Sequence, residues 1–175
     1  SVKTFEANLV YALTRVYTCD YGEKIANIVL NMYVNQHGQA TLAAAEASRE
    51  NGSSPNTVVS SAVAICGKKM VQKAMDASSA LIELFQYSKM NDVREKFDYA
   101  EQLKEADKYK DALLADGDDP CAAKLADCLN KAGYSALVQF VQDFAEANGR
   151  KLSTDVLFGA VWTTLGWAAL RTKKI

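Results

Sequence analysis

The residues whose chemistry is most constrained by their spacing are the four cysteines: Cys19, Cys66, Cys121 and Cys128. Four cysteines can form two disulfides in three ways. Cys121 and Cys128 are seven residues apart on a predicted helix, which places them about 10 Å apart along its axis. A disulfide needs Cα atoms within roughly 7 Å, which excludes this pair and therefore its complement, Cys19 with Cys66. Two connectivities remain: 19–121 with 66–128, or 19–128 with 66–121.

Two disulfides would indicate an oxidising compartment, and two other features point the same way. The chain opens on Ser1-Val2 without Met, as a mature protein does after signal cleavage. Asn51 begins an Asn-Gly-Ser glycosylation sequon in a predicted exposed loop. We therefore expect a secreted, extracellular protein with two disulfides, and Asn51 as a glycosylation candidate. The alternative is a reduced protein with buried thiols, because free cysteine is among the most buried residue types.

Metal and cofactor sites are not predicted. Zinc ligands usually lie two to four residues apart, unlike these cysteines, and the chain has only one histidine. A calcium loop starting at Asp116 would place Cys121 where an EF-hand needs glycine. Asp119-Pro120 is better explained as a helix N-terminus. No glycine-rich phosphate loop occurs either.

Catalytic residues are not predicted, although two side chains were considered. His37 is the only histidine available as a general base, and it lies at a predicted helix C-terminus, where capping explains it better. Glu83 is the one acid flanked by apolar residues, and on a helix it should point away from them. An enzyme would need a cleft with bonded polar groups near His37 or Glu83.

The composition describes a globular chain. Its 175 residues hold 20 Lys+Arg and 21 Asp+Glu, for a net charge of −1, which argues against nucleic acid as a partner. Only 2 Pro and 9 Gly exclude collagen-like and low-complexity classes. No apolar run reaches the roughly 18 residues of a membrane span. The length favours a single domain over residues 1–175.

The apolar residues repeat at three and four positions nearly everywhere, without the alternation of strands. The sequence therefore predicts an all-α fold, a single compact bundle of about seven to eight helices with short loops, cross-linked by the two disulfides. The expected helices span about 3–18, 21–36, 40–50, 56–87, 91–115, 120–131, 135–147 and 154–171, with a kink near Gly67 in the fourth.

Two of these helices differ sharply in polarity. Residues 91–115 carry most of the charge around a thin apolar stripe, which predicts an exposed outer helix, with partner binding as the alternative. Residues 154–171 are apolar almost all round, which predicts the centre of the bundle. Gly159 and Gly166 share a face there and would let another helix approach closely. The alternative for this face is the seam of a homodimer.

Aromatic residues suggest a place for binding. Tyr11, Tyr17, Tyr21 and Tyr33 gather in the first two helices, and Phe140, Phe144, Phe158, Trp162 and Trp167 gather in the last two. Such side chains form interfaces and apolar pockets, although plain core packing explains them too. The second group is our candidate interface or pocket.

The sequence as a whole predicts a secreted, non-enzymatic binding protein whose partner is a protein, its own copy or a small apolar ligand between helices. One alternative is a structural or self-assembling extracellular protein, because the Ala/Ser-rich segments 40–48 and 60–66 suit self-association. A small helical enzyme is the third hypothesis.

Overall fold

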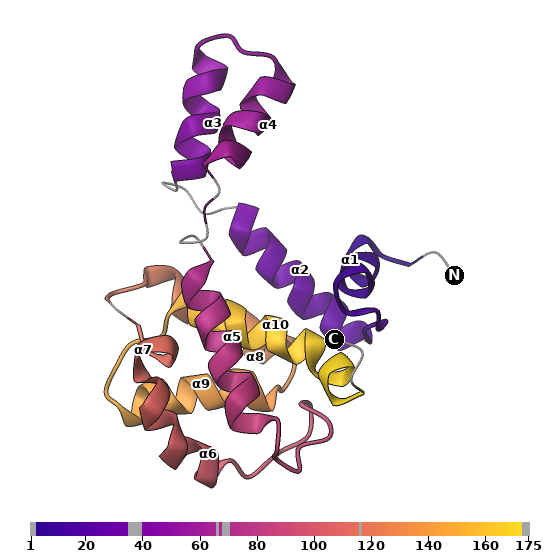
Figure 1. Ribbon diagram of the computed structural model, residues 1–175, viewed down its shortest axis with the longest axis vertical. Helices are drawn as coiled ribbons and strands as arrows, with labels where there is room; N and C mark the ends of the chain where they lie inside the picture. The colour runs from indigo at the N-terminus through magenta and orange to yellow at the C-terminus, as the bar shows by residue number, and fades with distance from the viewer. Residues whose placement is uncertain (1–2, 35–39, 66, 68–70, 116, 173–175) are drawn as a thin grey trace.

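Helices account for nearly all of the regular structure. The computed structural model describes residues 3–34, 40–65, 67, 71–115 and 117–172. Over these residues it contains no strand, so the all-α prediction is confirmed there. The helices are α1 (Phe5–Thr14), α2 (Asp20–Val34), α3 (Ala40–Glu50), α4 (Pro55–Ala64), α5 (Gln72–Phe85), α6 (Ala100–Glu105), α7 (Lys110–Leu113), α8 (Pro120–Ala132), α9 (Ala136–Ala147) and α10 (Thr154–Arg171) (Figure 1).

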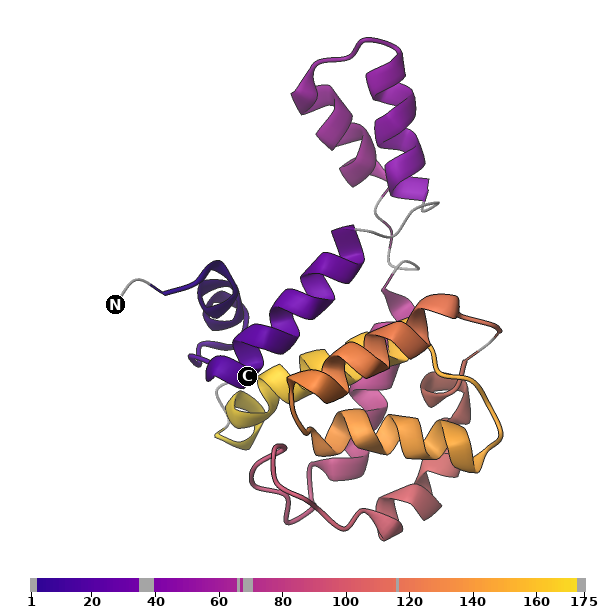
Figure 2. The same cartoon turned by 180° about the vertical axis from the view of Figure 1, so that it is seen from behind.

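The apolar helix α10 lies at the centre of the bundle. It runs behind α5 in Figure 1, and α8 and α9 cover its other face in Figure 2. Most of its side chains are buried, from Val156 to Ala169. A helix that is apolar all round must be enclosed by neighbours, and this prediction is confirmed.

The contact between α5 and α10 is unusually close because Gly159 has no side chain. A Cβ atom built at position 159 would lie 2.6 Å from the carbonyl oxygen of Ala74 and 2.9 Å from the Cβ of Ala77. The Ser78 hydroxyl donates a hydrogen bond to the Gly159 carbonyl oxygen at 3.0 Å. The predicted close helix approach at Gly159 is therefore confirmed, and the partner is α5 of the same chain.

One carboxylate serves the N-termini of two helices. Asp119 precedes α8, and its Oδ1 accepts a hydrogen bond from the Cys121 backbone N–H at 3.1 Å. Its Oδ2 accepts another from the Thr154 backbone N–H at 2.6 Å, at the start of α10. Ser153, the residue before α10, makes no capping bond through its own side chain. The prediction that Asp119 caps a helix is confirmed, and the same side chain also fixes the start of α10.

Two of the expected long helices were predicted wrongly. Residues 56–87 form two helices, since α4 ends at Ala64 and α5 begins at Gln72. Residues 91–115 begin with an irregular segment and become helical only at Ala100. There the Asp92 carboxylate accepts hydrogen bonds from the backbone N–H and guanidinium of Arg94. Such local side-chain bonds compete with helix formation.

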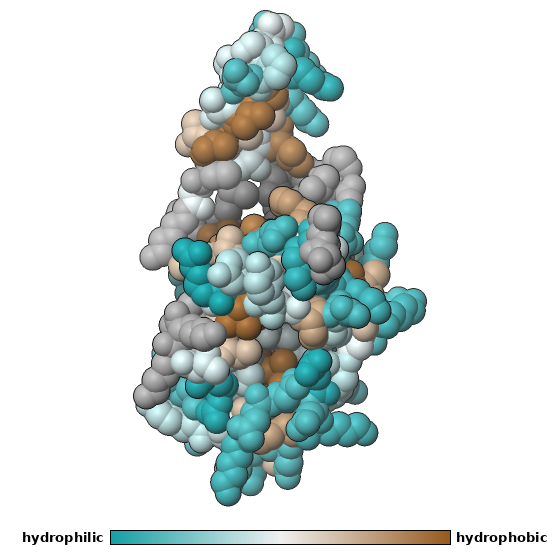
Figure 3. All heavy atoms as spheres, turned by 90° about the vertical axis from the view of Figure 1, so that its right-hand side faces the viewer, coloured by the Kyte–Doolittle hydropathy of each residue, from teal (hydrophilic) through white to brown (hydrophobic). Residues whose placement is uncertain are grey.

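The helices α3 and α4 pack against each other as a hairpin that projects from the other helices in Figure 1. Asn51 is exposed in the turn at its tip, as expected for a sequon. Apolar residues reach the surface of this hairpin (Figure 3), and Val59, Val63 and Ile65 are among the exposed ones. No helix over the described residues is both long and apolar enough to cross a membrane.

Replacing Gly159 with alanine tests the α5–α10 contact. We expect Gly159→Ala to lower the free energy of unfolding by about 1–3 kcal/mol, because the new methyl overlaps α5, despite alanine's higher helix propensity. Gly117→Ala is the matched control, since a Cβ there meets nothing within 4 Å and the residue's φ is not positive. Urea unfolding followed by circular dichroism measures both, and equal stability of the two variants would contradict the packing argument.

Candidate functional site

A cleft of about 270 Å³ opens where three segments meet: the connection from α1 into α2, the irregular segment at 91–94, and the C-terminal half of α10. Its lining is mostly apolar. Among the lining residues that the structure describes, only Asp92 and Arg94 are charged. The lining residues are Val16, Tyr17, Thr18, Cys19, Tyr21, Gly22, Ile25, Asn91, Asp92, Val93, Arg94, Thr164, Leu165, Trp167 and Ala168.

In the inner part of the cleft, Thr164 is hydrogen-bonded and Tyr21 is packed against its neighbours. The Thr164 hydroxyl pairs with that of Ser135 at 2.8 Å, and both residues are buried. The ring of Tyr21 lies against Gly133, where a Cβ would come within 2.9 Å of it. Burial of the Tyr21 phenol raises its pKa to about 12, so it is neutral at ordinary pH. This part of the cleft therefore offers shape and apolar surface without charge.

The segment that carries the charged residues is fixed to the helices on both sides. The Trp167 indole N–H donates to the carbonyl oxygen of Met90 at 3.3 Å. The Ala136 backbone N–H, at the start of α9, donates to the carbonyl oxygen of Val93 at 2.7 Å. Two bonds from two different helices therefore hold Asp92 and Arg94 in place.

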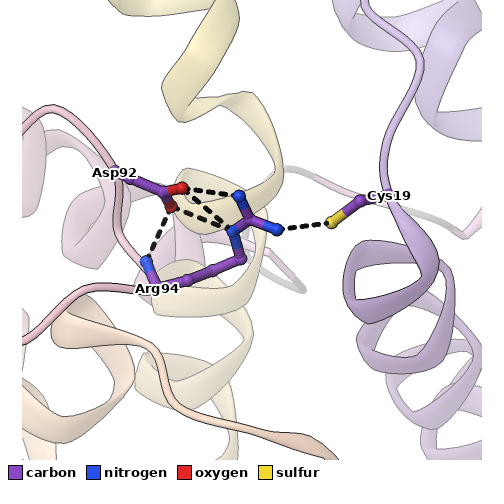
Figure 4. A network of polar contacts seen from close by, with 3 residues as sticks. All are labelled: Cys19, Asp92 and Arg94. Carbon is purple, nitrogen blue, oxygen red and sulfur yellow. Dashed lines mark hydrogen bonds and ion pairs between the residues drawn. The ribbon is translucent and has the colours of Figure 1, made fainter.

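Arg94 bridges the mouth of the cleft (Figure 4). Its Nε and one terminal nitrogen donate to the Asp92 carboxylate, the shorter of these contacts being 2.6 Å. Its other terminal nitrogen donates to Cys19 Sγ across the gap at 3.5 Å. The hydrogen bonds from Arg94 lower the pKa of Asp92, so this carboxylate is ionised at neutral pH. The mouth thus presents a neutral ion pair beside an exposed thiol.

The predicted disulfides do not form between the described cysteines. Cys19, Cys121 and Cys128 are free thiols, and Cys66 lies outside the described residues. Both expected connectivities join Cys19 to α8, so both are wrong in this structure. For the pairing with Cys121 the reason is geometric: Tyr21, two residues after Cys19, packs on Gly133 at the C-terminal end of α8. Cys121 is in the first turn, about 18 Å away along a helix of this length.

The predicted aromatic group is divided between the core and the cleft. Phe140, Phe144 and Phe158 are fully or almost fully buried, and Trp162 is partly buried. The Phe140 ring meets the Phe85 ring edge-on, with centroids 5.0 Å apart. Of the five, only Trp167 lines the cleft. Tyr17 and Tyr21 from the other aromatic group line it too, and the Tyr17 ring stacks on Tyr11 with centroids 4.3 Å apart.

The acidic residues Glu83 and Asp155 do not line the cleft. Glu83 is exposed and accepts a hydrogen bond from the Tyr109 hydroxyl at 2.7 Å, so it does point away from its apolar neighbours. Asp155 is partly buried in the first turn of α10; burial, and secondarily the charge of Asp119, raise its pKa. His37 lies outside the described residues. No group of three or more potential metal ligands occurs among the residues that the structure describes.

Comparison with known proteins adds no family to this geometry: no protein-family model matches the chain, and no curated protein or solved structure is significantly similar to it. Any function must therefore be argued from the cleft itself.

Sequence reasoning missed Arg94 and Asp92 as site residues because it placed them on a regular solvated helix. The local signal was present, since an Asp two residues before an Arg can bond that residue's backbone N–H as well as its side chain. Nothing in the sequence indicated that this turn would face Cys19, which lies 75 positions earlier.

Labelling with a maleimide in the absence of reductant tests the state of the thiols. We expect Cys19 and Cys121 to react rapidly in the native protein because both are exposed, and Cys128 to react more slowly because it is partly buried. Mass spectrometry of the digested protein identifies each labelled cysteine. If Cys19 reacted only after reduction, it would be part of a disulfide in the native protein, and the prediction from the sequence would be supported.

Proposed function

We propose that this protein is a binding protein that holds a small, largely apolar ligand in the cleft between α2, residues 91–94 and α10. The observation that carries the proposal is a mostly apolar, pre-formed hollow whose charged lining residues, Asp92 and Arg94, are paired with each other at its mouth. Ligand pockets usually have this composition, in which apolar walls give affinity and a few polar groups set orientation.

The size of the cleft limits the ligand. Its volume of about 270 Å³ lies just below the roughly 300–1,000 Å³ of pockets that take drug-sized molecules. A ligand with a short alkyl chain or with two linked aromatic groups fits this range. The stacked Tyr17 and Tyr11 at the rim extend the apolar surface outward, since Tyr17 is 51% exposed.

This proposal can be tested by blocking the cleft with a substitution and measuring the binding of a neutral fluorescent probe, N-phenylnaphthylamine. Ala168 lines the cleft on the exposed side of α10, so Ala168→Phe should fill it and weaken probe binding at least about tenfold, since the displaced contacts exceed 1.4 kcal/mol. Ala47→Phe, at an exposed position on α3, is the matched control. Equal binding by both variants, or no binding by the native protein, would contradict the proposal.

Self-association through the α3–α4 hairpin is the second candidate function. Val59 and Val63 are each 62% exposed on α4, and none of the ten residues of α4 is charged. A helix face that buries no charge can pair with a copy of itself at low desolvation cost. The Ala/Ser-rich segments singled out in the sequence fall largely on these two helices.

A concentration series in size-exclusion chromatography tests self-association. If it occurs, the apparent mass should rise with concentration, and Val63→Glu should abolish the rise by placing a charge in the paired face. Tyr87→Glu is the control, because Tyr87 is 90% exposed and lies outside the hairpin. A strict monomer at high concentration would count against this function.

Secretion and glycosylation at Asn51 stay part of the proposal. The sequon supports them, since Asn51 is exposed in the turn between α3 and α4. Its side-chain nitrogen, the atom that a glycan would modify, donates to the Ala47 carbonyl oxygen at 2.8 Å, a bond that modification would have to exchange for water. The disulfides no longer support secretion.

A further inference from the structure

Arg94, at the mouth of the cleft, has N–H groups that make no hydrogen bond to the described residues. A guanidinium has five N–H donors in one plane. Asp92 takes the Nε–H and one donor of a terminal nitrogen, and Cys19 takes one donor of the other. Among the described residues, the two remaining donors have no partner. Each of the two terminal nitrogens carries one of them.

Two parallel N–H groups match the two oxygens of a carboxylate. The end-on edge of the Arg94 guanidinium, between its two terminal nitrogens, has such a pair of N–H groups, while Asp92 bonds the Nε side of the group. The contact with Cys19 is a weak competitor there, because sulfur is a weak acceptor and lies 3.5 Å from the donor nitrogen. A carboxylate could therefore displace it at little cost while the Asp92 bonds stay intact.

The charges around the mouth favour an anion over a cation. Arg171 lies behind the lining residue Asn91 and donates to its side-chain oxygen at 3.3 Å. The pair of Arg94 and Asp92 is neutral, so Arg171 adds a net positive charge beside the lining residue Asn91. The acids in the first turn of α2, Asp20 and Glu23, line a separate hollow together with Glu6 and Lys24.

We propose that the cleft takes a small amphipathic carboxylate, with its apolar chain against Trp167 and Leu165 and its carboxylate on the end-on edge of Arg94. This inference rests on the proposed ligand-binding function and narrows it to a chemical class. The apolar walls of the cleft and the Arg94 guanidinium at its mouth impose that orientation.

The test compares octanoate, octanol and octylamine, which share a chain and differ in the head group, by displacement of N-phenylnaphthylamine from the native protein. We expect octanoate to bind roughly five- to tenfold more tightly than octanol, as one charge-assisted contact at a partly exposed site allows, and octylamine to bind most weakly. The preference should shrink in concentrated salt, because Arg94 is partly exposed.

Three variants test whether the preference for octanoate over octanol depends on Arg94. Arg94→Gln should reduce octanoate binding to the level of octanol and leave octanol unchanged. Arg49→Gln makes the same charge change on α3 and should alter neither. Asp92→Asn, which removes the competing carboxylate, should increase the preference for octanoate, and this variant keeps the test valid if loss of Arg94 disturbs the loop.

The outcomes separate this inference from the function on which it rests. Equal binding of octanoate and octanol, tighter binding of octylamine, or a preference that survives in Arg94→Gln would each overturn the carboxylate assignment while leaving apolar ligand binding in place. Absence of binding by all three, together with failure of the neutral probe to bind, would overturn both.

Discussion

The close packing of α5 on α10 at Gly159 is the constraint on which the rest of the structure depends. Because no side chain separates the helices there, the backbone of α10 rests directly on that of α5, and the Ser78 hydroxyl bonds to the Gly159 carbonyl oxygen. This contact fixes the position of α10 across one face, while α8 and α9 close the other (Figure 2). Asp119 then fixes where α10 begins, through its bond to the Thr154 backbone N–H.

The cleft follows from the position of α10. Trp167 and Leu165 form one wall directly, and the indole N–H of Trp167 holds the carbonyl oxygen of Met90. That bond, with the one from Ala136 to Val93, places Arg94 at the mouth opposite Cys19. The charged end of the cleft is therefore positioned by the apolar centre of the bundle, although the two are far apart in the sequence.

The sequence predicted those parts of the fold whose signals are local. The bounds of α3, α8 and α10 agree with expectation within a residue. Their signals, such as the cap at Asp119 and the apolar run of α10, involve only residues that are close together in the sequence. It failed at residues 91–99, where helical periodicity was outweighed by the bonds between Asp92 and Arg94. It also failed for the disulfides, since spacing excludes pairs on one helix but cannot place Cys19 relative to α8. The cleft combines three distant segments, so only Trp167 among the five candidate residues belongs to it.

The distribution of polar groups is the reason that we propose binding, and not catalysis, at this cleft. General acid–base chemistry needs titratable groups in apolar surroundings, within reach of the reacting atoms. Here the inner hydroxyls of Thr164 and Ser135 satisfy each other, and the Tyr21 phenol is held neutral by burial. The charged groups stand at the solvent-facing mouth, where Asp92 is committed to Arg94. Under the proposed function, the end-on N–H groups of Arg94 orient a ligand whose apolar part lies in the cleft.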